Sequence, residues 1–288
     1  MCGWEVFRMN IEFIKMHGAG NDYIYIDMIR HGYKVDFQDL AQKISLRHFG
    51  VGGDGLVLIM ESDKADYRMR MFNSDGSESE MCGNAIRCVG KYLHDNGYLK
   101  TSEFSIETSG GIKYLLLVEK DANGRAVKLK VDMGEPILNG KDIPVNVDKE
   151  PVMEIEVMGY SGTAVSMGNP HFVIFVDRIT PTHVLTHGPK LEINPLFPNK
   201  ANIEFIQVLD RHTIKMRVWE RGAGETLACG TGACAGVVAG VLNNIVERTV
   251  DVKLPGGTLR IEWNKDNNRV FLTGPAEEVF RGIYNYSK

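Results

Sequence analysis

The feature that most constrains the fold of this 288-residue chain is that its sequence repeats itself once. Residues 67–88 align with residues 214–235 without a gap, at a constant offset of 147 residues. In this alignment Cys82 falls on Cys229, and the glycine that follows each cysteine is also shared. Because the offset is about half of the chain length, we expect two similar halves that each supply one copy of the same local structure.

A change of composition near the middle of the chain indicates where the halves meet. Residues 134–152 contain three prolines and two glycines, which is typical of a linker. This composition predicts a boundary near these residues. We assign residues 1–130, with a return of residues 276–288, to an N-terminal half, and residues 131–275 to a C-terminal half.

Hydrophobic periodicity predicts mostly strands. Alternating or short apolar runs are typical of strands that are buried on one or both faces. The predicted strands are residues 56–60, 67–72, 127–133, 172–176, 203–208, 213–219 and 259–263.

Helices are fewer in this sequence. Apolar residues at i, i+3, i+4 and i+7 predict a helix over residues 37–44, with Asp36 as its N-cap and Gly50 after its end. Two further helical runs, residues 83–93 and 231–242, each begin at a cysteine of the repeat. The sequence therefore predicts an α+β fold of two related, sheet-rich halves.

Both repeat cysteines lie in a chemically suggestive position. In each copy a predicted strand ends, a polar, glycine-containing loop follows, and Cys82 or Cys229 stands where a helix starts. The start of a helix offers unpaired N–H groups and the positive end of the helix dipole. These groups lower the pKa of a thiol, and they also bind a carboxylate. We therefore expect two reactive thiols close to a bound anion.

Two equivalent cysteines indicate a reaction that treats both faces of one atom. A twofold repeat places its equivalent residues opposite each other, so one thiolate can remove a proton while the other thiol delivers one to the opposite face. This is the chemistry that inverts a stereocentre next to a carboxylate. Helix N-termini and a dry site then stabilise the carbanion without a cofactor. The sequence predicts a cofactor-independent amino-acid racemase or epimerase, with no metal site.

Composition argues against several other classes of protein. The formal charge of −4 and the isoelectric point near 6.1 are unlike the basic surface of a nucleic-acid-binding protein. The longest apolar run, residues 234–242, is much shorter than the ~18 residues that span a membrane. We expect neither a nucleic-acid partner nor membrane insertion.

The cysteine content favours reduced thiols. Five cysteines in a chain of this length do not form a disulfide scaffold, and residues 1–10 lack the blocks of a signal peptide. We therefore expect a cytoplasmic protein. Cys88 and Cys234 lie a turn or more into their helices, where a cysteine is usually a small core residue, and we expect no role for Cys2.

Other interpretations of these motifs are weaker. A zinc site is disfavoured because the cysteines lack the short spacing and the additional ligands of such sites. Residues 50–55 formally match a dinucleotide-binding fingerprint, but a helix precedes them and an apolar run follows, so we predict a turn. His171 as a structural core histidine, and Arg221 as a surface ion pair, remain alternatives to functional roles.

Several segments together resemble the diaminopimelate epimerase family. The matching segments are KMHGAGNDY (15–23), FNSDGSESEMCGNAIRC (72–88), VDMGEP (131–136), SMGNPH (166–171), ERGAGETLACGTGACA (220–235) and LPGGTLRIEW (254–263). The resemblance runs from about Ile11 to the end of the chain. It implies two pseudo-symmetric barrel-like halves, each a curved sheet around a central helix, with the active site in the cleft between them. It also implies a homodimer that converts LL- to meso-diaminopimelate in lysine and cell-wall precursor synthesis, without a cofactor.

The resemblance also implies roles for individual residues. Cys82 and Cys229 match the acid/base pair, and His171 and Glu220 match residues that support the two thiols. The residues that match substrate-binding positions are Asn21, Asn73, Gly83, Asn84, Asn169, Asn202, Glu220, Arg221, Gly230 and Thr231. Phe280 matches an aromatic position that contributes to dimerisation. Gly55 departs from the family, which often has a substrate-contacting glutamine there.

Two competing functions share much of this sequence evidence. A racemase of another amino acid, such as histidine or a hydroxyproline, would keep both cysteines and change the residues around the distal part of the substrate. A binding module, or an isomerase of the phenazine type that has lost one base, would lack one of the two cysteines, and both are present. Deuterium uptake at Cα distinguishes an epimerase from a binding module.

Overall fold

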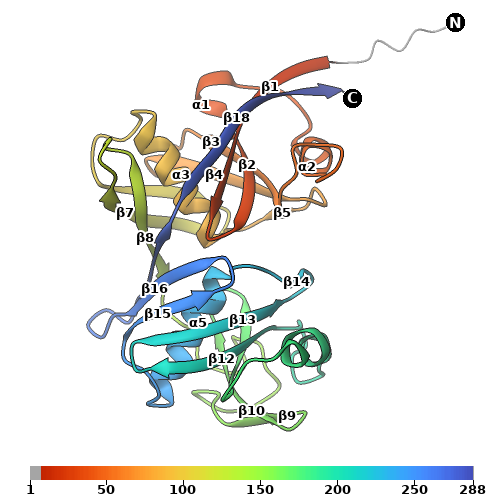
Figure 1. Cartoon of the computed structure of the whole chain (residues 1–288), viewed down its shortest axis with the longest axis vertical. Helices are drawn as coiled ribbons and strands as arrows, with labels where there is room; N and C mark the ends of the chain where they lie inside the picture. Colours follow the sequence, from red (N-terminus) through yellow and green to blue (C-terminus); the bar gives the residue numbers. More distant parts are fainter. Residues whose placement is uncertain (1–7, 288) are drawn as a thin grey trace, which may run out of the picture. The chain divides into compact units, whose positions relative to one another are not determined.

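The structure of the protein is a computed structural model, which describes residues 8–287. The chain divides into two compact units, one formed by Met1–Leu129 with Pro275–Lys288 and the other by Lys130–Gly274. Figure 1 follows the chain through both units. Cys2 lies outside the described residues.

The first unit is a mixed sheet with both antiparallel and parallel pairings. Its strands are β1 (Arg8–Gly18), β2 (Asn21–Asp27), β3 (Gly55–Met60), β4 (Tyr67–Asn73), β5 (Glu78–Ser79), β6 (Glu103–Thr108), β7 (Gly111–Lys120), the start of β8 (Ala126–Gly134) and β18 (Glu277–Ser287). β18 pairs with β1, and β1 pairs with β2. β2 and β3 run parallel, β3 and β4 antiparallel, β4 and β6 parallel, and β6 and β7 antiparallel.

The second unit repeats this order. Its strands are the end of β8, β9 (Ile155–Val157), β10 (Tyr160–Ser166), β11 (Pro170–Phe175), β12 (Asn202–Asp210), β13 (Thr213–Glu220), β14 (Gly224–Glu225), β15 (Thr249–Leu254), β16 (Gly257–Trp263) and β17 (Val270–Pro275). β9 pairs with β10 and β10 with β11, both antiparallel, and β11 and β12 run parallel. β12 to β13, β13 to β15 and β15 to β16 then repeat the antiparallel, parallel, antiparallel order. The repeat in the sequence is therefore a repeat of topology, in which β10 to β16 correspond to β1 to β7.

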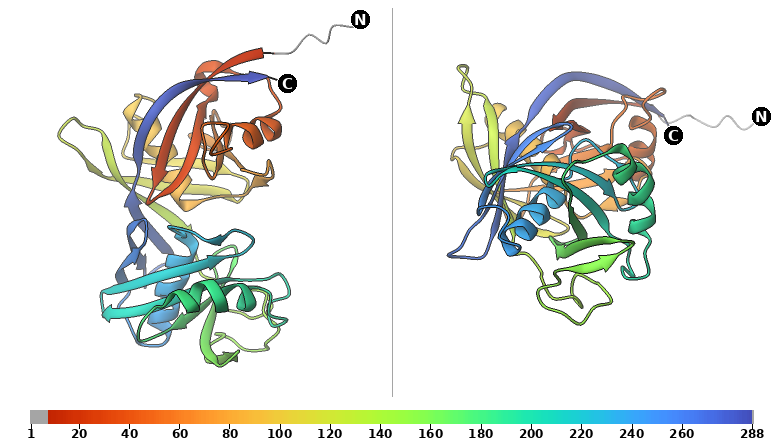
Figure 2. Two further views of the ribbon diagram at one scale, coloured as in Figure 1. Left: turned by 45° about the vertical axis from the view of Figure 1, so that its right-hand side comes forward. Right: turned by 60° about the horizontal axis from the view of Figure 1, so that its bottom comes forward.

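Each unit contains one long helix that the strands surround (Figures 1 and 2). α3 (Gly83–Asp95) contacts β1, β2, β7 and β18, whereas α5 (Gly230–Leu242) contacts β10, β11, β12, β15 and β16. Strands on several sides bury α3 continuously from Gly83 to Leu93. Glycines allow the close packing, because a Cβ at Gly236 of α5 would lie 2.6 Å from the Ile206 side chain. The predicted α+β class is confirmed, and each unit is a barrel-like sheet around a central helix.

Shorter helices cover the outer side of the sheets. α2 (Phe37–Ile44) begins at Asp36, whose carboxylate accepts a hydrogen bond from the Asp39 N–H, as predicted for an N-cap. Its buried face, Leu40, Ala41 and Ile44, packs on residues of β2, β3 and β4. The C-cap is Ser45 rather than Gly50. The remaining short helices are α1 (Met28–His31), the π-helix η1 (His183–His187) and α4 (Gly188–Glu192).

The proline-rich stretch near residues 134–152 is not a free linker. It belongs to the second unit, and Ile143, Val145 and Val152 are buried in the core of that unit. The chain passes from one unit to the other inside β8 instead, between Leu129 and Lys130. Proline and glycine mark irregular backbone here, and irregular backbone with buried side chains is part of a domain and not a boundary.

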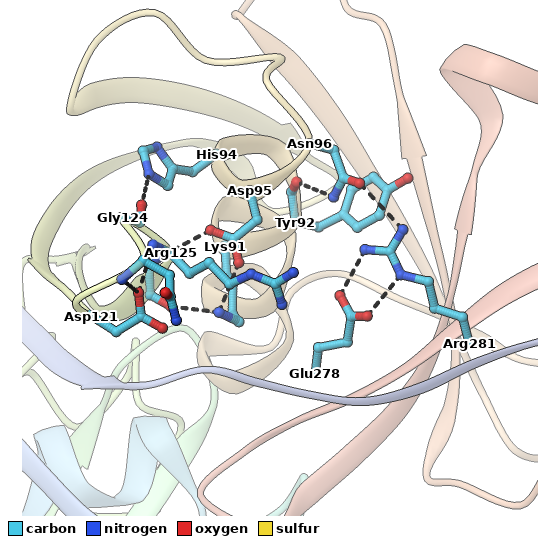
Figure 3. A network of polar contacts seen from close by, with 12 residues as sticks. Lys91, Tyr92, His94, Asp95, Asn96, Asp121, Gly124, Arg125, Glu278 and Arg281 are labelled. Atoms are coloured by element: carbon cyan, nitrogen blue, oxygen red, sulfur yellow. Dashed lines mark hydrogen bonds and ion pairs between the residues drawn. The ribbon is translucent and has the colours of Figure 1, made fainter.

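Polar contacts fasten the C-terminal end of α3 to the surrounding strands (Figure 3). The buried Lys91 donates to Asp95 at 2.8 Å and to the Ala126 carbonyl at 2.6 Å. Asp95 in turn accepts a hydrogen bond from the Ala126 N–H at 2.8 Å, so the start of β8 is held to the helix. Arg281 of β18 forms a two-pronged ion pair with Glu278 and donates to Asn96 at 3.3 Å. The nearly buried Lys91–Asp95 pair thus has its hydrogen bonds satisfied and ties α3 to β8.

Among the described residues, no helix is both long and apolar enough to cross a membrane.

Candidate active site

Both repeat cysteines are the N-caps of the central helices. Cys82 precedes α3 with φ −133° and ψ 123°, and Cys229 precedes α5 with φ −108° and ψ 112°. These are extended backbone conformations, as N-cap residues adopt, and the Cys229 side chain also accepts a hydrogen bond from the helix N–H of Gly232, whereas Cys82 makes no side-chain cap bond. The predicted placement of Cys82 and Cys229 at helix starts is confirmed, although α5 begins at Gly230 rather than at Thr231.

Neutral amides surround the Cys82 thiol. The thiol donates a hydrogen bond to Oδ1 of Asn21 at 3.2 Å, and the Asn84 side chain donates to the same oxygen at 3.3 Å. Asp54 fixes the orientation of Asn21, because its carboxylate accepts from the Asn21 amide nitrogen at 2.6 Å. Asp54 is also paired with Arg47 at 2.9 Å. The sequence predicted Asn21 and Asn84, but not the carboxylate of Asp54 that orients Asn21.

Two further predicted residues of the first unit lie near the start of α3 or at the end of β4. The carbonyl of Gly83 accepts a hydrogen bond at 2.8 Å from Arg87, which is fully buried and also donates to Asn84 at 2.9 Å. Asn73 ends β4, is partly exposed and donates to the Ser77 hydroxyl at 3.0 Å. At Gly55 a Cβ would lie 2.1 Å from the Phe72 carbonyl oxygen, so this backbone leaves no room for a glutamine.

The Cys229 thiol is more enclosed than the Cys82 thiol. Cys229 is 5% exposed, whereas Cys82 is partly exposed. The Cys229 sulfur accepts a hydrogen bond from the Gly232 N–H at 3.4 Å and lies 3.5 Å from the Thr231 hydroxyl. The helix start therefore does contact this thiol, as the sequence predicts.

The expected lowering of the Cys229 pKa is nevertheless wrong for this structure. Burial raises the pKa of Cys229 well above its ordinary value, and the carboxylates of Glu220 and Glu204 raise it further. The hydrogen bonds from Thr231 and Gly232 oppose this shift without reversing it. The sequence shows the helix start, which lowers the pKa of a thiol. It does not show the burial and the two nearby carboxylates, which raise it. In this conformation Cys229 is a thiol and therefore an acid.

Glu220 lies at the end of β13, close to Cys229. Burial raises the pKa of the Glu220 carboxyl above its usual range, while hydrogen bonds with Thr226 and Cys229 act in the opposite direction. The Thr226 hydroxyl donates directly to Oε1 of Glu220. Glu220 is thus in position to exchange hydrogen bonds with the thiol.

His171 is fully buried between two oxygen acceptors. Its Nδ1 lies 2.7 Å from Oε1 of Glu204, and its Nε2 lies 3.0 Å from Oδ1 of Asn169. Glu204 is also fully buried. The sequence analysis missed Glu204, although a single acidic residue in an otherwise apolar predicted strand was a signal that could have found it.

Asn202 and Arg221 lie together at the edge of the second unit. The buried Asn202 donates to the Pro170 carbonyl at 2.9 Å and accepts from the Arg221 backbone N–H at 2.9 Å. The Arg221 side chain is exposed and donates to the Asn199 carbonyl at 3.2 Å. Asn202 therefore holds the loop that presents the Arg221 guanidinium to solvent.

The two halves use equivalent positions differently. In the first unit Tyr23 pairs with Gly55, and in the second unit His171 pairs with Asn202 at the same point of the parallel ladder. The tyrosine–glycine pair thus becomes a histidine–asparagine pair in the second unit. The same backbone position therefore carries a glycine in the first unit and the buried Asn202 in the second.

Phe280 lies on β18, away from the start of α3. Its side chain is 46% exposed, and its apolar neighbours Val279 and Ile283 are 55% and 62% exposed. The Phe280 ring contacts the Phe13 ring edge-on. Within residues 8–287, no group of three or more His, Cys, Asp or Glu side chains is arranged to hold a metal ion.

The fold is shared with solved structures of isomerases and their relatives. A phenazine biosynthesis protein of the PhzF family from Bacillus anthracis matches with a TM-score of 0.67 at 19% identity, over 96% of this chain and 99% of that chain. A hydroxyproline epimerase from Agrobacterium vitis matches with a TM-score of 0.67 at 12% identity, over 97% and 93% of the two chains. At these identities the likeness shows the fold, which here carries a cysteine at the start of each central helix.

Sequence comparison gives the family. The sequence profile described as diaminopimelate epimerase matches residues 13–139 and 163–279. A diaminopimelate epimerase from Acetivibrio thermocellus is 57% identical over 277 residues, covering 94% of this chain and 98% of its own. One from Methanococcus maripaludis is 52% identical over 276 residues, covering 94% and 99%. The chain belongs to the diaminopimelate epimerase family and is an isomerase, as its resemblance implied.

Proposed function

We propose that this enzyme epimerises LL-diaminopimelate to meso-diaminopimelate with Cys82 and Cys229 as its two acid/base groups. The observation that carries this proposal is that both cysteines are N-caps of equivalent helices in a repeated fold. The names of relatives at 50–57% identity support the substrate, and they disfavour a racemase of histidine or hydroxyproline.

The reaction consists of two proton transfers at one carbon. One cysteine thiolate takes the α-proton and becomes a thiol, and the electron pair of the broken C–H bond stays on the substrate as a carbanion. The other cysteine thiol gives its proton to the opposite face of that carbon and becomes a thiolate. The two residues exchange roles in the reverse direction, so the mechanism requires both thiols to reach the same carbon.

The amides at the two helix starts would stabilise the developing charge. Unpaired N–H groups after Cys82 and Cys229, at Gly83–Asn84 and Gly230–Thr231, are suited to the reacting carboxylate and to the charge that moves onto it. Asn21, Asn169 and Asn84 supply further donors and acceptors for the zwitterionic end of the substrate. No step of this scheme needs a cofactor or a metal ion.

The surroundings of the thiols suggest which form each takes before substrate binds. Cys229 is a buried thiol whose raised pKa suits proton donation. Cys82 donates its proton to Asn21 in this structure, but it is partly exposed at its helix start, so losing that proton carries a smaller desolvation cost than at Cys229. We therefore assign the first proton abstraction from one of the two stereoisomers to Cys82, and the first proton donation to Cys229. His171 and Glu220 support Cys229 in this scheme.

The biological setting follows from the substrate and the surface. We propose a cytoplasmic enzyme of lysine and cell-wall precursor synthesis. We also propose a homodimer that uses β18, because Val279, Phe280 and Ile283 are apolar side chains left exposed on that strand.

The decisive experiment supplies LL-diaminopimelate alone in D2O. Protein dialysed against EDTA and freed of pyridoxal phosphate is expected to form the meso isomer and to place deuterium at Cα of the inverted centre. A binding protein would do neither. Inversion that depended on added zinc or pyridoxal phosphate would refute the cofactor-free scheme.

A further inference from the structure

The two halves differ most sharply at one buried position next to the cysteines. Glu204 on β12 stands where Val57 stands on β3, because Glu204 pairs with Val218 and Val173 just as Val57 pairs with Met71 and Tyr25. Both side chains are completely buried. The second unit has therefore placed a carboxylate where the same fold in the first unit packs a hydrocarbon.

The carboxylate is bonded to His171. Oε1 of Glu204 lies 2.7 Å from Nδ1 of His171, and the other ring nitrogen faces Oδ1 of Asn169 at 3.0 Å. The short bond to a carboxylate fixes the ring, and Nε2 then faces the Asn169 side chain. This arrangement also leaves the Asn169 amide nitrogen, a donor, for the substrate carboxylate in the proposed function.

Stability alone does not account for this carboxylate. The second oxygen, Oε2, is buried and has no hydrogen-bond partner within the described residues. A buried carboxylate with an unmet oxygen is costly, whereas a valine fits the same position in the first unit. The charge is therefore retained at a cost to folding, which is typical of groups that serve a reaction.

The start of α5 is shaped around the carboxylate. A Cβ at Gly232 would lie 2.7 Å from Oε1 of Glu204 and 3.2 Å from the Cys229 sulfur, so the glycine lets both groups approach the same turn of helix. The charge of Glu204 raises the pKa of Cys229 and of Glu220, while the charge of His171 lowers the pKa of Glu220. The two charges thus act on the groups that exchange protons.

We propose that Glu204 is a positioning residue of the epimerisation, which fixes the His171 ring through its Nδ1 beside the helix turn that carries the Cys229 sulfur. A hydrogen bond to a buried carboxylate holds the ring in one orientation, so Nε2 and the Asn169 side chain that faces it are in place before the proton moves. In the first unit the equivalent Val57 can make no such bond. This inference rests on the proposed function.

The test is the variant Glu204→Gln, which keeps an oxygen acceptor for Nδ1 and removes the charge. We expect a loss of roughly a hundredfold in kcat with KM changed less than about threefold, as for other carboxylates that orient a catalytic histidine. Glu204→Asp, which restores the charge, is expected to recover part of the activity.

Two further measurements keep the inference separate from folding and from the substrate. Nitrogen-15 NMR of the His171 ring, assigned with His171→Gln, is expected to show a strongly hydrogen-bonded Nδ1–H in the wild type and a weaker hydrogen bond in Glu204→Gln. Glu262→Gln, which breaks the partly exposed pair with Lys130 in the same unit, is the charge-matched control and is expected to keep wild-type activity. An Nδ1 without this hydrogen bond in the wild type, or wild-type kinetics in Glu204→Gln, would overturn the inference. A wild type that is inactive on diaminopimelate but keeps the hydrogen bond would refute the proposed function and leave the contact between Glu204 and His171 standing.

Discussion

The side-chain oxygen of Asn21 accepts the thiol proton of Cys82, with 3.2 Å between Sγ and Oδ1. The equivalent asparagine of the second half, Asn169, turns its oxygen to His171 instead. Cys229 contacts the Gly232 N–H, the Thr231 hydroxyl and the Glu220 carboxyl, and burial raises its pKa. Two cysteines at the same backbone position therefore have different reactivity, and this difference can be measured.

We expect iodoacetamide to label Cys82 well before Cys229 in the substrate-free protein at pH 7. Alkylation needs an accessible thiolate, and Cys229 is 5% exposed with a pKa raised by burial and two carboxylates. Peptide mass spectrometry over time gives both rates. Cys88 is the internal control, because burial raises the pKa of its thiol to about 11 and it is expected to stay unmodified. Equal labelling of Cys82 and Cys229 would show that the buried state of Cys229 is not the one in solution.

Replacing either cysteine by alanine is expected to abolish epimerisation and to keep the fold. Both proton transfers are needed for each turnover, so Cys82→Ala and Cys229→Ala should each lower kcat by at least about 10²- to 10⁴-fold. Removing one sulfur atom from a site of this kind costs about 1 kcal/mol of stability. Circular dichroism and thermal melting check the fold. Substantial turnover by either variant would remove that cysteine from the mechanism.

Much of this site was predictable because it depends on local sequence. A cysteine between a polar, glycine-containing loop and a helical run is predicted to be an N-cap. The repeat contains this pattern twice, at Cys82 and at Cys229. Strand positions also followed from periodicity: the predicted strand 213–219 is β13, Thr213–Glu220. These features require only neighbours along the chain.

The remaining features depend on contacts between distant segments. The hydrogen bond from Asn21 to Asp54 spans 33 residues, and so does the bond between His171 and Glu204. A sequence shows that a charge stands in an apolar strand, but not which group it meets. The pKa of Cys229 likewise depends on burial, which outweighed the helix dipole that the sequence could show.

Mild oxidation is expected to inactivate the enzyme, and dithiothreitol is expected to restore it. If both thiols serve one carbon, they come close enough to bridge when no substrate is bound, and accessible thiolates oxidise most readily. Non-reducing peptide mapping should find Cys82 linked to Cys229. Inactivation with both thiols still free would contradict the two-base arrangement.

Glu220→Gln is expected to stabilise the protein at neutral pH while it removes activity. Burial raises the folded-state pKa of Glu220. Ionising this carboxyl group therefore destabilises the folded protein once the pH exceeds the pKa of the unfolded state. The cost is absent at low pH, below about 4.3, and is complete above the folded-state pKa. Glutamine avoids this cost and can still accept the hydrogen bond from Thr226.

Urea unfolding of wild type and variant at several pH values should therefore show a gain in the free energy of unfolding that disappears on acidification. Glu225→Gln, which breaks the ion pair with Arg217, is the control and should give no gain. A gain independent of pH would contradict the assignment of the effect to the charge of Glu220.

Substrate choice is expected to depend on the distal end of the substrate through Arg221, with Asn73 and Asn202. The reacting carboxylate is served by two helix starts, so the arginine is available for the second carboxylate of diaminopimelate, which a guanidinium binds with two parallel hydrogen bonds. The Arg221 side chain is exposed. Within the described residues its guanidinium makes one hydrogen bond, to the Asn199 carbonyl, so it can turn to a ligand at little cost. Arg221→Met should therefore leave the melting temperature nearly unchanged and cost about 2–5 kcal/mol in kcat/KM, the range for a charged partner left unpaired in a complex. Arg221→Lys should recover only part of this loss, because an ammonium group does not match both carboxylate oxygens.

Lysine, which has no distal carboxylate, should be a very poor substrate of the wild type, and Arg221→Met should change the kcat/KM for lysine little. The measurement is kcat/KM for diaminopimelate, lysine and histidine in the wild type and both variants. Turnover of lysine or histidine by the wild type at the rate of diaminopimelate would show that the distal carboxylate is not recognised.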